Sequence, residues 1–467
     1  MSRRLILAVL LSLALASHGV GCDDGGDGDG DGDADGDGDG DGDGDGDGDG
    51  DGDGDGDGDG DGDGDGDGDG DGDGDGDGDG DGDGDGDGDG DGDGDADACT
   101  VIIESGGSLQ DAADAAVPGD VICIHAGEYG TFDVAVSGTE AEPIVFRAYP
   151  GERRQARISG SDPREAHGIF MDDVEYVVID GLWIDEVNQG VYIRYSDHVV
   201  VQNCLVTNIG QECLRFKFSD FGAFIGNEVH DCGVRSSEGL NGEGIYVGSG
   251  EEDGDDTHGV LVSGNIIWNT TDEGIELKGY TYDCIVENNV IHDLVIKDGG
   301  AIHVSTPDYD EPDLGNSGHV VRGNITYNIQ TRTEWSDGNG LCIMRGAEVY
   351  NNVSYDNQHY GIRLDDKLHH GGAITLYHNT MFGNGSGELG IFDGVTPDAR
   401  NNLGTDMAGN MLATEAMFVD AAGGDFHLAP GAAAIDAGED VGVDTDIEGT
   451  PRPQGDGFDM GAYELVP

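Results

Sequence analysis

The segment LVSGNII at residues 261–267 is followed by IVENNVI at 285–291 and by VVRGNIT at 320–326. In each segment apolar and polar residues alternate up to an asparagine, and an apolar residue follows it. Such alternation places one side of a strand against a core. One short strand cannot bury that side alone, so the repeat predicts that strands of successive coils stack in parallel around a shared core.

A second run, with glycine before alternating apolar residues, accompanies the first, as in GIYVG at 244–248, GIELK at 274–278 and GIRLD at 361–365. The two runs together predict an all-β fold, a single-stranded right-handed parallel β-helix of about nine or more coils. The asparagine of the first run recurs once per coil, so its amides are expected to hydrogen-bond along the stack while it also tolerates a tight turn. Its positions are Asn203, Asn227, Asn265, Asn289, Asn324, Asn352, Asn379 and Asn402.

Composition divides the chain into five parts. Residues 1–21 combine Arg3 and Arg4 with a short apolar run and predict a signal peptide. The following Cys22 predicts a lipidated N-terminus, against the alternative of an unmodified cysteine, and 22–98 is then an almost pure Asp-Gly linker, expected to be disordered. Residues 99–165 are interpreted as an N-terminal cap with the first coils, 166–405 as the β-helix and 406–467 as a C-terminal tail and cap.

Acidic residues number 100 and basic residues 20, and the acidic excess persists beyond the linker. This negative charge argues against nucleic acid as a partner. Separately, we expect the protein to be a monomer. Seven cysteines follow the linker, so at least one stays outside a disulfide, and Cys99 with Cys123 is the preferred pair. We predict an exported protein, lipid-anchored to a bacterial cell envelope or surface, or secreted.

The N-terminal stretches VPGDVI at 117–122, AGEY at 126–129 and PIVF at 143–146 resemble the first coils of pectate-lyase-like right-handed parallel β-helix proteins. The stretches HLAPG at 427–431 and DMGAYE at 459–464 resemble the tail of secreted bacterial β-helix proteins. The resemblance implies that residues 109–116 form a capping helix over the open end of the core, which would protect the unpaired first strand.

The glycine-led strands are predicted to turn a row of polar side chains outward. Five are basic, although basic residues are rare in this chain, and this favours a surface that holds an acidic sugar chain through charge and ring stacking. The alternative is a solvent-exposed sheet face that carries charge for solubility. The candidates are Lys278, Lys217, Arg215 and His303 for catalysis, and Tyr192, Arg194, Tyr246, Glu276 and Arg363 for substrate binding.

Glu212, Glu243 and Glu273 stand just before three consecutive glycine-led strands, with Asp272 beside the last of them. In register, these carboxylates lie about 5 Å apart, close enough to raise one another's pKa or to bind a cation. Calcium is therefore the candidate cofactor, with Glu212, Glu243, Asp272 and Glu273 as ligands. The alternative is a solvated acidic edge.

β-Helix polysaccharide lyases use a lysine or arginine base against a proton beside a uronate carboxylate, and the resemblance therefore implies β-elimination. Lys278, expected to have a lowered pKa beside Arg215 and Lys217, is the first candidate base and Lys217 the second. We predict a protein that binds an acidic, uronate-containing polysaccharide, with cleavage by β-elimination as one hypothesis. The alternative is a non-catalytic surface adhesin or a glycan-binding or structural module.

Overall fold

A computed structural model describes residues 99–467, except 161–165, 235–240, 250–254, 298, 307–316, 333–336 and 366–371. The predicted signal peptide, the lipidation at Cys22 and the Asp-Gly linker lie outside the described residues. No helix among the described residues is long and apolar enough to cross a membrane.

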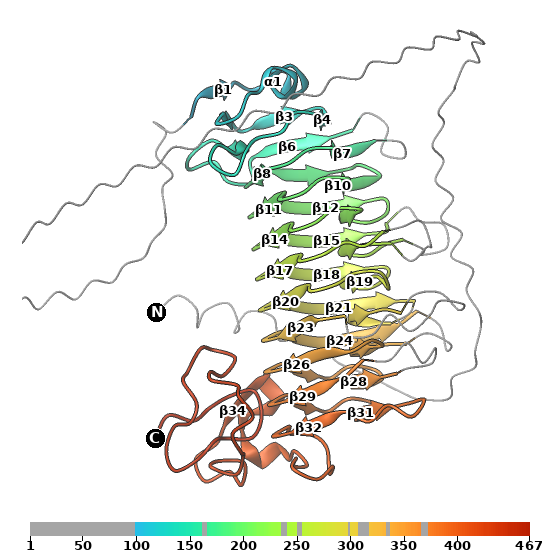
Figure 1. Cartoon of the computed structure of the whole chain (residues 1–467), viewed down its shortest axis with the longest axis vertical. Helices are drawn as coiled ribbons and strands as arrows, with labels where there is room; N and C mark the ends of the chain where they lie inside the picture. The colour runs from blue at the N-terminus through green and yellow to red at the C-terminus, as the bar shows by residue number, and fades with distance from the viewer. Residues whose placement is uncertain are drawn as a thin grey trace, which may run out of the picture. The chain divides into compact units, whose positions relative to one another are not determined.

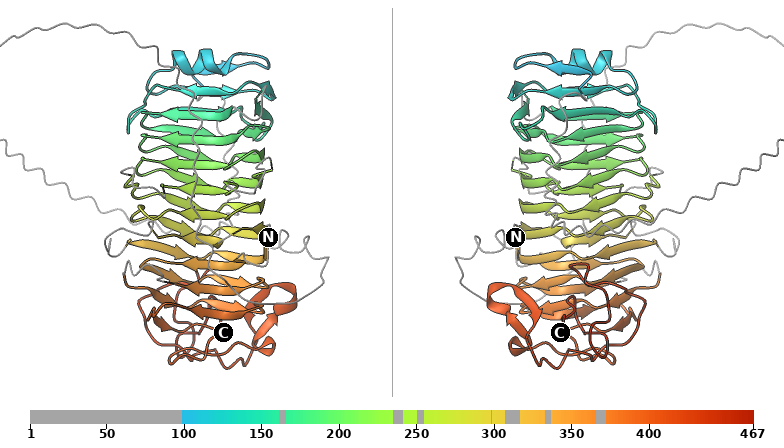
Figure 2. Two further views of the ribbon diagram at one scale, coloured as in Figure 1. Left: turned by 90° about the vertical axis from the view of Figure 1, so that its right-hand side faces the viewer. Right: turned by 90° about the vertical axis from the view of Figure 1, so that its left-hand side faces the viewer.

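The described chain winds into a right-handed parallel β-helix, as predicted, and Figures 1 and 2 show its strands stacked in chain order. Each complete coil contributes one strand to each of three sheets, named A, B and C here, and sheet A has one further strand at either end. Sheet A consists of β1 (Val101–Ile103), β2 (Val121–Ile124), β5 (Ile144–Ala148), β8 (Val177–Asp180), β11 (Val200–Gln202), β14 (Ala223–Ile225), β17 (Leu261–Ser263), β20 (Ile285–Glu287), β23 (His319–Arg322), β26 (Ala347–Tyr350), β29 (Thr375–Tyr377) and β32 (Asp398–Arg400).

Sheet B consists of β3 (Gly127–Tyr129), β6 (Ala156–Ser159), β9 (Trp183–Asp185), β12 (Leu205–Ile209), β15 (Glu228–Cys232), β18 (Ile266–Thr270), β21 (Val290–Ile296), β24 (Ile325–Thr331), β27 (Val353–Tyr355) and β30 (Thr380–Phe382). Sheet C consists of β4 (Phe132–Val134), β7 (His167–Asp172), β10 (Gln189–Arg194), β13 (Leu214–Lys217), β16 (Ile245–Val247), β19 (Ile275–Leu277), β22 (Gly300–Val304), β25 (Asn339–Ile343), β28 (Tyr360–Leu364) and β31 (Gly387–Ile391). The inward side chains of the three sheets form one continuous apolar core.

The predicted asparagine stack is present from Asn227 to Asn402. In each step the backbone N–H and the side-chain amide of one asparagine donate to the Oδ1 of the asparagine one coil further on, over 2.9–3.0 Å. Asn410 continues the stack beyond Asn402. The stack satisfies polar groups that the turn would otherwise bury without partners.

The prediction was wrong for Asn203. Cys204 occupies the stack position of that coil, because its backbone N–H donates to Asn227 Oδ1. Asn203 instead takes the preceding, left-handed position with φ of 57°, as Gly226 and Asn288 do in later coils. The stacked asparagines themselves therefore do not need left-handed backbone, because the residue before them makes the turn.

The N-terminal end of the core is covered by α1 (Leu109–Ala115), as the resemblance implied. Ser108 caps the helix, since its Oγ accepts a hydrogen bond from the backbone N–H of Asp111. Leu109 and Ala113 are buried against the first coils. This helix shields the apolar interior where the stack begins.

The C-terminal tail has its own small apolar cluster. It contains η3 (Glu415–Met417), η4 (Ala421–Gly423) and the antiparallel pair β33 (Phe418–Asp420) and β34 (Asp425–Leu428). The ring of Phe418 lies 5.5 Å from that of Phe382, and the ring of Phe426 lies 4.8 Å from that of Tyr355. The tail thus covers the outer face of sheet B at its last strands.

Two disulfides are present among the described cysteines. Cys99 pairs with Cys123, as predicted, and Cys213 pairs with Cys232. The second disulfide joins the residue before β13 to the last residue of β15 and so links the two ends of one coil. The thiols of Cys204, Cys284 and Cys342 are buried and not disulfide-bonded.

Removing the second disulfide in the Cys213→Ala/Cys232→Ala variant is expected to lower the free energy of unfolding by about 3 kcal/mol, because the link restrains a short loop in the unfolded chain. Urea unfolding measures the change. Cys284→Ala is the control for losing a buried thiol without losing a link. An equal loss of unfolding free energy in both variants would show that side-chain packing, and not the disulfide, causes the effect.

Candidate active site

The outer face of sheet C carries one column of side chains in register, one from each coil. Tyr192 lies opposite Arg215, Arg215 opposite Tyr246, and Tyr246 opposite Glu276. The column continues through His303 and Cys342 to Arg363. Eight of the nine side chains named for catalysis and substrate binding lie in this column or the adjacent row, and Lys278 directly follows β19. The structure therefore gathers them on one face.

The centre of this face is buried, unlike the solvent-exposed face of the alternative interpretation. Arg215 and Lys217 are each only 5% exposed, and the carboxylates of Glu212, Glu243 and Glu276 are buried as well. Burying a charge costs free energy unless another group compensates it. Charges added only for solubility would remain in water, so the burial speaks against that alternative and against a solvated acidic edge.

Lys278 lies among carboxylates rather than among cations. Its Nζ is 3.0 Å from Glu276 Oε1 and 5.1 Å from the centre of the Tyr246 ring. Burial lowers its pKa, but the negative charges of Glu276, Glu243 and Glu273 outweigh that effect and raise the pKa well above its ordinary value. The expectation of a lowered pKa was wrong, because these carboxylates surround Lys278, whereas Arg215 contacts the Tyr246 ring at 5.3 Å.

Three of the four predicted metal ligands converge. Glu243, Asp272 and Glu273 each offer a carboxylate oxygen within 4.8 Å of the others. Glu243 Oε2 and Asp272 Oδ1 are buried and have no hydrogen-bond partner among the described residues. Burial, followed by repulsion from neighbouring carboxylates, raises the pKa of both groups well above their ordinary values. Oxygen ligands with these properties suit a divalent cation such as calcium.

Glu212 does not belong to this group. Its Oε1 lies 3.4 Å from Arg215 Nη1, and its Oε2 accepts a hydrogen bond of 2.8 Å from Gln189 Nε2. The register places Glu212 one coil before Glu243, as predicted, but these two partners already satisfy its carboxylate. It orients Arg215 and adds negative charge near Glu243.

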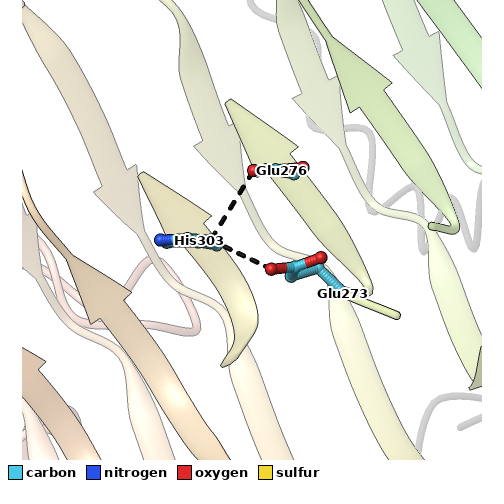
Figure 3. A group of neighbouring side chains, drawn as sticks. All are labelled: Glu273, Glu276 and His303. Atoms are coloured by element: carbon cyan, nitrogen blue, oxygen red, sulfur yellow. Dashed lines mark hydrogen bonds and ion pairs between the residues drawn. The ribbon is translucent and has the colours of Figure 1, made fainter. Parts of the chain in front are cut away.

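A second set of possible metal ligands, Glu273, Glu276 and His303, was missed from sequence (Figure 3). His303 Nδ1 lies 3.0 Å from Glu273 Oε1 and 3.6 Å from Glu276 Oε1. The register of β19 with β22 places Glu276 directly opposite His303, so the signal was present in the sequence. From sequence, His303 was predicted to act in catalysis and Glu276 in substrate binding. Glu273 is a member of both sets of possible metal ligands.

The sequence matches the family described as Pel9A-like, right-handed beta helix region, over residues 91–402, which is more than half of the chain. The chain belongs to this family. No match was found among curated proteins.

Solved structures resemble this Pel9A-like β-helix at low identity. An alginate lyase from Paenibacillus sp. str. FPU-7 is 22% identical, with a TM-score of 0.50, 63% of this chain and 97% of that one covered. A rhamnogalacturonan lyase is 15% identical, with a TM-score of 0.54. The match covers 69% of this chain and 90% of that one. Pectate lyase Pel9A is 17% identical, with a TM-score of 0.49. The match covers 78% of this chain and 96% of that one. At this identity the likeness to the alginate lyase and to the rhamnogalacturonan lyase shows the fold alone.

Arg194 and Arg363, on the outer face of sheet C, have carboxylate partners. Arg363 is held by Asp337 and, at 2.7 Å, by Asp365, with the Phe392 ring 4.9 Å away. Arg194 pairs with Asp172 at 3.2 Å. These pairs lie on either side of the buried cluster around Lys278, and we place Arg194 and Arg363 at the ends of the face rather than at its centre.

Proposed function

We propose that the protein binds a uronate-containing polysaccharide along the outer face of sheet C and cleaves it by β-elimination. The observation that carries this proposal is the buried cluster of Lys278, Arg215 and Lys217 with five carboxylates on that face. The carboxylates outnumber the three cations, and burial beside one another raises the pKa of two of them, Glu243 and Asp272. The five carboxylates are those of Glu212, Glu243, Asp272, Glu273 and Glu276. Such clusters are maintained at functional sites despite their cost. Membership of the Pel9A-like family and the solved lyases of the same fold support the choice of reaction.

The reaction needs a base, and Lys278 is the residue we assign. In β-elimination the base takes the proton on the carbon beside the carboxylate, a carbon–carbon double bond forms, and the bond to the leaving glycosidic oxygen breaks. The leaving oxygen takes up a proton and becomes a new chain end. Arg215, between the rings of Tyr192 and Tyr246 at 5.0 and 5.3 Å, offers positive charge to the uronate.

Glu243, Asp272 and Glu273 would hold a calcium ion in this proposal. The bound ion would supply positive charge that offsets the buried carboxylates and the uronate. Those carboxylates are what raise the pKa of Lys278, so the lysine is expected to release its proton more readily in the calcium-loaded protein. The predicted export of the chain is consistent with a polysaccharide outside the cell.

Calcium is expected to stabilise the protein by about 3 kcal/mol at a hundredfold excess over its Kd, because it binds the folded site and not the unfolded chain. Thermal unfolding with and without a chelator measures this. Glu243→Gln should remove most of the response, whereas Glu348→Gln, at an exposed position on β26, should keep it. A full calcium response in Glu243→Gln would contradict the proposed ligand set.

The reaction itself is tested on pectate, alginate and chondroitin, with calcium and with a chelator. Ultraviolet absorbance of the unsaturated uronate product is the expected signal. Binding of these polymers without any product would favour the adhesin alternative. New reducing ends without unsaturation would point to hydrolysis by the neighbouring carboxylates Glu243 and Glu273.

A further inference from the structure

The disulfide between Cys213 and Cys232 lies among the residues of the candidate site. Cys213 directly follows Glu212 and stands two residues before Arg215. Its backbone N–H donates to the carbonyl oxygen of Glu243, one coil further on, over 3.0 Å. Both cysteines are fully buried, and their Cα atoms are 5.6 Å apart. One end of the disulfide is thus joined by the chain to two site residues and by a hydrogen bond to a third.

The position of Cys213 bears on how Arg215 is held. Gln189 Nε2 donates to Glu212 Oε2 over 2.8 Å, and Glu212 Oε1 lies 3.4 Å from Arg215 Nη1. Arg215 itself lies between two tyrosine rings, at 5.0 and 5.3 Å from their centres. Since Glu212 and Arg215 flank Cys213 in the chain, a shift of the Cys213 backbone would move both partners of this ion pair relative to those rings. A misplacement of about 1 Å is enough to impair a binding or reacting group.

The Cys232 end of the disulfide supports the segment that leads to Glu243. The chain leaves β15 at Gly233 and returns at Gly242, directly before Glu243. A Cβ atom on Gly233 would lie 2.8 Å from Gly242 Cα and closer still to Thr271 Oγ1, so this approach of the two ends needs glycine. The ends of the segment therefore meet beside Cys232, and the disulfide ties their meeting point to the turn before β13.

The proposed calcium ligands need such support because they repel one another. Glu243, Asp272 and Glu273 each offer a carboxylate oxygen within 4.8 Å of the others. The backbone N–H of Gly244 donates to the carbonyl oxygen of Glu273 over 3.0 Å, so hydrogen bonds link the turns of three successive coils from Cys213 through residues 243 and 244 to Glu273. A framework that is fixed before calcium arrives lowers the cost of bringing the ligands together.

We propose that the Cys213–Cys232 disulfide is a positioning element of the site, which holds Glu243 for calcium and Arg215 for the uronate before either ligand binds. This inference rests on the proposed function and makes the affinity for both ligands depend on a covalent link outside the ligand set. A chain in which this disulfide has not formed would fold with a weakened site. The Cys99–Cys123 disulfide, at β1 and β2, lies at the N-terminal end of the stack and has no such role.

The test compares Cys213→Ala/Cys232→Ala with Cys99→Ala/Cys123→Ala, each in the full chain. The two disulfides close similar lengths of chain, with separations of 19 and 24 residues, so both variants should lose comparable stability. Isothermal titration calorimetry measures the Kd for calcium at a temperature where circular dichroism shows both variants to be folded. The first variant is expected to raise this Kd about tenfold, and the second to leave it unchanged.

Kinetics separate positioning from a general loss of structure. With calcium saturating, Cys213→Ala/Cys232→Ala is expected to raise KM about fivefold and to change kcat by less than about twofold, because Arg215 is displaced while Lys278 is not. Gln189→Leu keeps the disulfide but removes the other support of the ion pair. It should raise KM in the same way and leave the calcium Kd unchanged.

If the alanine pair does not fold, Cys213→Val/Cys232→Ala, which fills more of the buried volume, takes its place with the same expectations. An unchanged calcium Kd in the folded variant, or an equal rise in both disulfide variants, would overturn the positioning role. A selective rise in a protein that forms no unsaturated product from any polymer would support the link and refute β-elimination. Unsaturated product together with an unchanged calcium Kd in the variant would refute the link and leave the proposed function standing. A wild type that binds no calcium would overturn both the link and the ligand set.

Discussion

Replacing Lys278 by alanine is expected to lower kcat for formation of the unsaturated product by about a thousandfold, the range typical for loss of a positioned proton-transfer group. Lys278 contacts Glu276 at 3.0 Å and is 15% exposed at its side chain, more than the side chains of Glu276, Glu273 and His303 around it. Part of the Lys278 side chain is therefore open on the outer face of sheet C. Initial rates on the best polymer from the substrate tests measure the loss.

Lys278→Arg separates proton transfer from charge. Arginine keeps the positive charge beside Glu276 but does not release its proton at accessible pH, so this variant should be as inactive as Lys278→Ala. Substantial activity in Lys278→Arg would show that the residue acts through its charge alone. A larger loss in Lys217→Ala than in Lys278→Ala would move the assignment of the base to Lys217.

Replacing Asn289 by alanine is expected to lower the free energy of unfolding by about 4 kcal/mol or more. Asn289 is fully buried in the middle of the asparagine stack. Its Oδ1 accepts from the backbone N–H and the side-chain amide of Asn265, and its Nδ2 donates to the carbonyl of Val262. Each buried group left without its partner costs about 1–3 kcal/mol. Urea unfolding followed by circular dichroism measures the change.

The adjacent Asn288 provides the control. It is exposed and has φ of 56°, a backbone conformation that glycine also adopts without strain. Asn288→Gly should therefore keep nearly all of the stability that Asn289→Ala loses. Similar stability losses in the two variants would mean that the turn conformation, rather than the stack, sets the stability of this coil.

The repeat was sufficient to predict the fold, because strand alternation and the recurring asparagine are local features that appear in every coil. The error at Asn203 shows where such reasoning ends. Asparagine suits both the stacked position and the left-handed position before it, and residues 202–204 contain only one asparagine. Only the hydrogen bond from the Cys204 backbone to Asn227 Oδ1 distinguishes the two.

The register of the candidate site's side chains could be predicted, but not the site's electrostatics. Parallel strands in register place Arg215, Tyr246 and Glu276 in one column whatever surrounds them. The pKa of Lys278, in contrast, depends on which way the long side chains of Glu243 and Glu276 turn and on how deeply they are buried. The sequence contains neither quantity, so a lysine expected among cations was found among carboxylates.

The placement of the site strands within sheet C bears on how the protein loses its structure under stress. β13, β16, β19 and β22 are flanked by three strands of the same sheet on either side. Each coil contacts mainly its neighbours, so fraying is expected to begin at the ends of the stack and to advance coil by coil. The central coils then form the last part of the stack to exchange their amide hydrogens. Partial damage at either end, by heat or by a protease, would leave the cluster around Lys278 intact until most of the stack had opened.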